Sequence, residues 1–151
     1  MEVHELMKGL AGRLGIELDA GDVCSFEADG MVVSMCFPQE ADFLVMSCDL
    51  GEPPPERLEG LYKALLGANF MFGGTMGSTI ALNPDDGRIA LCRAMPTAAL
   101  DVDQLCNQLE HFLNTAETWR KIVADYREGN EVPSSGDAAG MASTPDAFLR
   151  V

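Results

Sequence analysis

The feature that most constrains the fold is a long run of apolar residues at helical spacing in the second half of the chain. From Asp101 onward, apolar residues recur every three or four positions, which is the pattern of one face of an α-helix. They are Val102, Leu105, Leu109, Phe112, Leu113, Ala116, Trp119, Val123 and Tyr126. The pattern predicts one long amphipathic helix that ends near Tyr126.

Three strands are predicted upstream of this helix. Residues 23–28 and 31–37 flank Asp29-Gly30, a dipeptide suited to the positive φ angles of a two-residue hairpin turn. Residues 43–48 follow after a short turn, which leaves little room for a crossover helix and indicates an antiparallel meander. Apolar residues at both alternating positions of 43–48 predict burial of both faces of this strand.

Two further helices and a second hairpin complete the expected order. Residues 3–14 carry apolar side chains at helical spacing, and Gly15 follows as a stop. The run Pro53-Pro54-Pro55 leads into a helix that runs to about Gly67, with Glu56 near its positive end. Residues 78–82 and 88–95 form a hairpin around the turn at 83–87. The prediction is an α+β fold with a twisted, antiparallel five-stranded sheet and three helices in the order α-βββ-α-ββ-α.

The domain organisation follows from length and composition. A chain of 151 residues with 47% hydrophobic residues suits a single domain with its own core. Beyond Gly129, serine, glycine and proline dominate, and such a segment cannot bury enough apolar area to offset its chain entropy. We therefore expect one domain over residues 1–129 and a flexible C-terminal tail over 130–151.

Charge and cysteine usage narrow the possible partners and location. The formal net charge is −14, so the chain should repel phosphate backbones and anionic lipid surfaces. Neither nucleic acid binding nor membrane insertion is expected. The five cysteines form an odd set without a close pair, which argues against a disulfide framework and a zinc site. A reducing cytoplasm is the expected location.

The sequence contains no recognisable catalytic or cofactor-binding motif. The only histidines are His4 and His111, and neither has a local partner for nucleophilic catalysis. The glycine-rich stretch 73–77 lacks the lysine and Ser/Thr pattern of a P-loop. We therefore expect no catalytic residue, no metal and no cofactor. An enzyme that uses the glycine-rich stretch with nearby carboxylates remains a lesser alternative.

The order of elements and several local segments resemble a known family. The segments are Leu65-Leu66-Gly67-Ala68-Asn69, Ile80-Ala81-Leu82-Asn83 and Gly87-Arg88-Ile89-Ala90-Leu91. From about Val3 to Tyr126 the chain is similar to the class I type III secretion chaperones of the Tir chaperone (CesT) family. The resemblance implies a homodimer in the bacterial cytosol. It would bind the N-terminal chaperone-binding segment of secreted effector proteins without ATP and keep them secretion-competent.

The resemblance also implies where partners bind. The first helix and early strands correspond to the effector-facing surface, which places Leu6, Leu10, Val33 and Met35 among the expected contacts. The second helix, the following aromatic patch and the strand from Arg88 correspond to dimer-forming material. Its expected interface residues are Leu61, Leu65, Phe70, Phe72, Ile89 and Leu91. A core role within the monomer stays open for Phe70 and Phe72. An alternative function is a small adaptor or regulatory module of the same fold that binds folded proteins.

Overall fold

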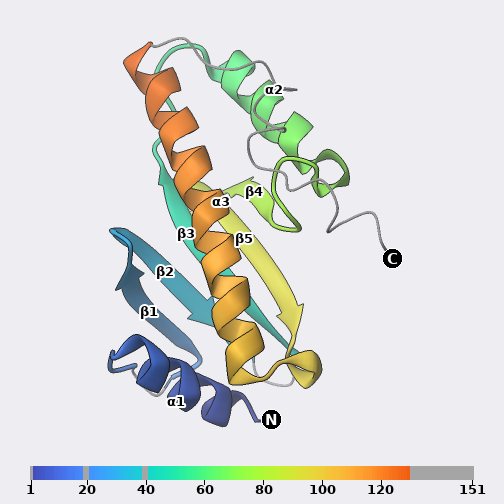
Figure 1. The fold of residues 1–151 in the computed structure, drawn as a ribbon. Helices are drawn as coiled ribbons and strands as arrows, with labels where there is room; N and C mark the ends of the chain where they lie inside the picture. The colour runs from blue at the N-terminus through green and yellow to red at the C-terminus, as the bar shows by residue number, and fades with distance from the viewer. Residues whose placement is uncertain (1, 19–20, 39–40, 130–151) are drawn as a thin grey trace.

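The order of helices and strands agrees with the sequence prediction. The computed structural model describes residues 2–18, 21–38 and 41–129. Figure 1 shows the arrangement of the helices and strands, of which α3 is the longest. The elements are α1 (Val3–Leu14), β1 (Val23–Ala28), β2 (Met31–Cys36), β3 (Phe43–Gly51), α2 (Leu58–Asn69), the 3-10 turn η1 (Phe70–Phe72), β4 (Thr79–Leu82), β5 (Ile89–Pro96), the 3-10 turn η2 (Thr97–Ala99) and α3 (Val102–Glu128).

The five strands form one antiparallel sheet in the spatial order β1-β2-β3-β5-β4. Helix α3 lies across one face of this sheet, and α1 lies on the same side near one end of β1 and β2 (Figure 1). The core fills the space between the sheet and α3. Its largest fully buried side chains include Trp119 and Phe112 from α3 and Met35, Leu44 and Met46 from the strands.

The opposite face of the sheet carries smaller and more polar side chains. In β3 the buried residues alternate, so Leu44, Met46 and Cys48 point to the core while Phe43 is exposed. The expectation that β3 is buried on both faces was therefore wrong. Apolar residues at alternating positions indicate which side chains share a face, but they do not show whether another layer covers it.

Helix α3 is well defined at both ends. The side chain of Asp101 accepts a hydrogen bond from the backbone N–H of Gln104, and the Gln104 side chain accepts one from the backbone N–H of Asp101, both at 2.8 Å. This reciprocal arrangement is a capping box. At the other end Gly129 adopts a left-handed conformation with φ 72°, which suits glycine.

Helix α2 begins later than expected. The three prolines at 53–55 do not lead directly into it, because Arg57 takes a left-handed φ of 64° and the helix starts at Leu58. The guanidinium of Arg57 lies 4.9 Å from the centre of the Tyr126 ring, and the Tyr126 hydroxyl donates to the carbonyl oxygen of Gly60 at 3.4 Å. These contacts join the start of α2 to the end of α3.

The packing of α1 on α3 depends on one of two neighbouring glycines. A Cβ atom at Gly9 would overlap the side chain of Val102, whereas a Cβ at Gly12 would meet no atom. We expect Gly9→Ala to lower the free energy of unfolding by about 1–3 kcal/mol through overpacking. The matched change Gly12→Ala should raise it by about 0.5–1 kcal/mol because alanine favours the helix. Urea denaturation followed by circular dichroism measures both values, and equal effects would contradict this packing.

The predicted tail, residues 130–151, lies outside the described residues, so the division of the chain after residue 129 stays a prediction. Within the described ranges, no helix has both the length and the hydropathy needed to cross a membrane.

Candidate protein-binding site

Strand β1 is an edge of the sheet, and nothing in the described chain pairs with its outer side. Its register with β2 places Cys24 opposite Met35 and Ser25 opposite Ser34. One residue before the strand, the carbonyl oxygen of Asp22 accepts from the N–H of Phe37 at 2.7 Å. Hydrogen-bonded and non-hydrogen-bonded pairs alternate in an antiparallel ladder. Because Asp22 is in a hydrogen-bonded pair, the backbone groups of Cys24 and Phe26 also form hydrogen bonds with β2.

The backbone groups of the intervening residues then point away from β2. They are the N–H and C=O groups of Val23, Ser25 and Glu27. A row of such outward groups is what an added strand needs for pairing.

A groove lies between α1 and the start of β1. We call it the α1 groove, and it encloses about 810 Å³. Its apolar lining includes Met7, Ile16, Leu18 and Phe37. Charged or polar groups at its rim come from His4, Lys8, Glu17 and Asp22. An apolar side chain of a bound segment would lose water contact on entering this groove.

A second cavity lies at the other end of β1. We call it the hairpin pocket, and it encloses about 570 Å³ between the end of α1, the tip of the β1–β2 hairpin and α3. Leu14, Ile16, Leu109, Leu113 and Cys106 supply apolar surface, while Arg13, Glu27, Asp29 and Glu110 supply charge. Ile16 lines both cavities. Together they border the helix-covered side of the β1 edge.

The residues predicted to contact an effector lie beneath this region. Leu6, Leu10, Val33 and Met35 are all fully buried in the core. None of the structural observations tests contact with a partner, so these assignments stay predictions. The side chains that line the two cavities are better placed for such contact, because a partner reaches them without opening the core.

A second apolar surface lies at the end of α2. It consists of Leu66, Phe70, Met71 and Phe72, and we call it the α2 patch. Phe70 is 77% exposed and Met71 is 73% exposed. Met71 and Phe72 both have positive φ angles, 53° and 55°, which non-glycine residues adopt only at a cost in free energy. An exposed apolar patch of this kind is a candidate binding surface.

The loop after this patch is fixed by buried hydrogen bonds. The indole N–H of Trp119 donates to the carbonyl oxygen of Gly74 at 2.8 Å. The Asn69 side chain accepts from the N–H of Ile80 and donates to its carbonyl oxygen, each at 2.9 Å. These bonds join α3 to the loop after the patch and the end of α2 to β4.

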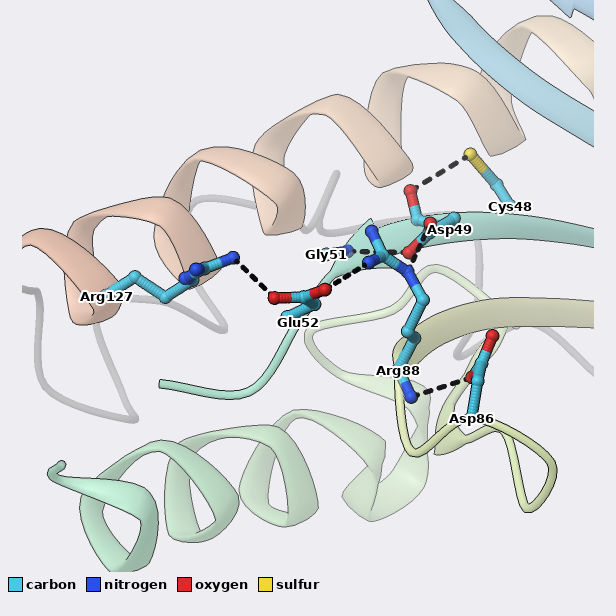
Figure 2. A network of polar contacts seen from close by, with 7 residues as sticks. All are labelled: Cys48, Asp49, Gly51, Glu52, Asp86, Arg88 and Arg127. Atoms are coloured by element: carbon cyan, nitrogen blue, oxygen red, sulfur yellow. Dashed lines mark hydrogen bonds and ion pairs between the residues drawn. The ribbon is translucent and has the colours of Figure 1, made fainter. Parts of the chain in front are cut away.

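An ion-pair network anchors the connection between β3 and α2 (Figure 2). Arg88 at the start of β5 pairs with Asp49 at 2.7 Å and with Glu52 at 3.0 Å, and Arg127 of α3 pairs with Glu52 at 3.4 Å. The hydrogen bond to Asp49 is the main cause that raises the pKa of Arg88 above its usual value. The network ties the segment before α2 to both the sheet and α3.

The residues predicted for the dimer interface divide into two groups. Phe70 and Phe72 are exposed within the α2 patch. Leu61, Leu65, Ile89 and Leu91 belong to the core of the monomer. The assignment of all six to an interface stays a prediction, and the exposed pair is accessible to a second copy.

The described residues offer little for catalysis. They contain no cluster of three or more histidine, cysteine or acidic side chains that could hold a metal ion. Burial raises the pKa of the Cys48 thiol to about 11, and it also raises that of Cys92. Both thiols are therefore protonated and weakly nucleophilic at neutral pH.

Several surface residues escaped the sequence analysis. Val23 and Val32 are more than half exposed and were not assigned to a binding surface. Leu66 and Met71 are more exposed still, but they belong to the second helix and the aromatic patch already predicted to form the dimer. Ile16 and Leu18 lie between predicted elements and line the α1 groove. These two residues could have indicated the groove from the sequence. Connecting segments are usually polar, so apolar residues just after a helix suggest that they pack against another part of the protein.

Comparisons with known proteins give the family from one family model and the fold from solved structures. The model of the Tir chaperone protein (CesT) family matches residues 5–120. No curated protein matches the chain. The structure is similar to that of the ExsC-ExsE complex, with a TM-score of 0.68 and 21% identity over 80% of this chain and 92% of the other.

Two further solved structures show the same fold at low identity. One is the heterodimeric ExoU-SpcU complex from the type III secretion system of Pseudomonas aeruginosa, with a TM-score of 0.60, 21% identity, and coverage of 78% of this chain and 93% of the other. Another is YbjN of E. coli, described as a putative transcription regulator, with a TM-score of 0.58 and 8% identity over 87% of this chain and 97% of the other.

Proposed function

The chain belongs to the Tir chaperone (CesT) family, and from this we propose that it is a type III secretion chaperone that binds the N-terminal segment of one or more effector proteins. It holds that segment in the cytosol in a secretion-competent state and uses no ATP. The observation that carries the proposal is the free β1 edge bordered by the α1 groove and the hairpin pocket.

The client segment binds as an extended strand along β1. Its backbone pairs with the outward groups of Val23, Ser25 and Glu27, and its alternate side chains enter the two cavities. Backbone pairing is independent of side-chain identity, so it lets one chaperone accept clients of different sequence. The apolar cavities select among clients, because they favour segments whose apolar side chains fit into them. The client stays unfolded because its hydrogen bonds and apolar side chains are already satisfied on the chaperone.

The homodimer forms through the α2 patch. Apolar surface of this kind is stabilised when a second copy covers it, and a twofold interface uses each residue twice. The proposal is supported by the exposure of Phe70 and Met71 and by the left-handed backbone of Met71 and Phe72. Helix α2 adjoins β4, at the opposite edge of the sheet from β1, so the β1 edges remain free for the client.

We expect Phe70→Asp to convert the dimer to a monomer. A carboxylate at the centre of the patch would be desolvated without a partner, which costs several kcal/mol on association. Light scattering of the purified chain measures the mass. Val32→Asp is a matched control, since Val32 is exposed on β2, away from α2 and β5, and should leave the dimer intact. A Phe70→Asp variant that remains dimeric would place the interface elsewhere.

Catalysis plays no part in the proposed function. The family and fold are those of non-catalytic chaperones, and the protein works by binding alone. The net charge of −14 supports a protein partner in place of nucleic acid or an anionic membrane.

Affinity purification from the native cytoplasm, with mass spectrometry of co-purified proteins, tests the function. We expect one or two secreted proteins, and limited proteolysis of the complex should leave their N-terminal region protected. Recovery of folded partners without such a protected segment would favour the adaptor or regulator function. Recovery of metabolic enzymes alone would contradict the chaperone function.

A further inference from the structure

We propose that the hairpin pocket selects a lysine or arginine in the client segment, four residues away from an apolar side chain that enters the α1 groove. This inference rests on the proposed function, because it describes the chemistry of the segment that binds along β1. It assigns side-chain types to two positions of the client, which pairing of the backbone alone would not select.

The spacing follows from the positions of the two cavities along β1. Cys24 lines the α1 groove and Ala28 lines the hairpin pocket. Both residues lie on the helix-covered face of the strand, since Cys24 pairs with Met35 and Ala28 pairs with Met31 in the same ladder. They are four residues apart, or about 13 Å. An adjacent strand therefore presents two side chains, four residues apart, to the two cavities.

The hairpin pocket combines an apolar floor with an acidic rim. Leu109 and Leu113 of α3 lie among its lining residues, and Asp29 and Glu110 add two carboxylates. The cation of Arg13 is already paired with Asp103, and Arg120 donates to the carbonyl oxygen of Gly30 in the hairpin turn. Carboxylates outnumber cations among these groups. A cation is therefore favoured at the rim over an anion.

Lysine and arginine match both parts of the pocket. Their methylene stems cover apolar surface, and their charged ends stay at the solvent boundary. An aspartate or glutamate at the same position would meet like charges. The α1 groove differs, because it offers the apolar side chains of Met7, Leu18 and Phe37, and the cation of Lys8 offsets one of the carboxylates of Glu17 and Asp22. Charge selection is thus expected at one end of β1, and apolar selection at the other.

Selection from a phage-displayed library of random nine-residue segments tests this inference. On the full-length protein we expect enriched segments with an apolar residue and a lysine or arginine four positions apart, about threefold to fivefold over background for the cation. The double variant Asp29→Asn and Glu110→Gln removes two rim charges with little change in shape. Asparagine tolerates the positive φ of 51° at position 29. This variant should keep the apolar preference and lose the cation preference.

A matched control removes two carboxylates elsewhere. Glu59→Gln and Glu117→Gln change the net charge equally, on α2 and on α3, and should leave the cation preference intact. Apolar enrichment without a cation preference on the natural protein would overturn this inference and leave the chaperone function standing. An equal cation preference on the neutralised pocket would also overturn it. Failure to enrich any segment would contradict the proposed function itself.

Discussion

Trp119→Ala is expected to lower the free energy of unfolding by about 3–5 kcal/mol, the range for removing a large buried aromatic side chain. Trp119 is fully buried beneath the sheet and is the only tryptophan of the chain. Its indole N–H also donates to Gly74, so the change leaves that carbonyl oxygen without its partner. The loss should show as a lower midpoint of urea denaturation, followed by circular dichroism because the fluorescent residue is gone.

Trp119→Phe separates the two contributions. Phenylalanine keeps much of the buried ring but cannot donate to Gly74, so we expect a smaller loss of about 1–3 kcal/mol. This variant should also loosen the loop that supports the α2 patch. An alanine variant as stable as the natural protein would contradict the placement of Trp119 at the centre of the core.

Ser25→Pro is expected to weaken client binding by at least about tenfold. Proline removes the outward N–H of Ser25 and places its ring against the free edge, where the client strand must pair. The β1–β2 ladder should survive, because Ser25 and Ser34 form a non-hydrogen-bonded pair. Titration of a client's N-terminal segment into each variant, followed by fluorescence anisotropy, gives the two dissociation constants.

Ser25→Ala is the matched control for this change. It removes the hydroxyl, which lies 2.8 Å from that of Ser34, but it keeps the backbone N–H. We expect affinity within about twofold of the natural protein, since the contact is solvent-exposed and contributes little. If the alanine and proline variants bind equally well while both remain folded, the client does not pair with the β1 edge.

Most of the fold could be predicted from local sequence patterns. Asp29-Gly30 gave the correct two-residue hairpin because both residues adopt the positive φ angles that this turn requires, 51° and 75°. The start of α2 was missed because it depends on Arg57, whose left-handed conformation accompanies its packing over Tyr126, far along the chain. Contacts between distant residues decide such details, and no local pattern contains them.

The binding surface was harder to predict for a physical reason. Leu6 and Leu10 repeat at helical spacing whether they face a core or a groove, so periodicity identified their face without showing that α3 covers it. Ile16 and Leu18 break the helical pattern and were passed over, although they line the α1 groove. The exposure of Phe70 was also hard to predict, because it lies in a turn where Met71 has a left-handed conformation that no local sequence pattern indicates.

Amide hydrogen exchange, resolved by residue and measured with and without a client segment, tests the central claim most directly. We expect the amides of Val23, Ser25 and Glu27 to become strongly protected in the complex. Those of Cys24 and Phe26 are bonded to β2 and should be protected already. Protection confined to the α2 patch, with no change along β1, would contradict the account and place the client on a different surface.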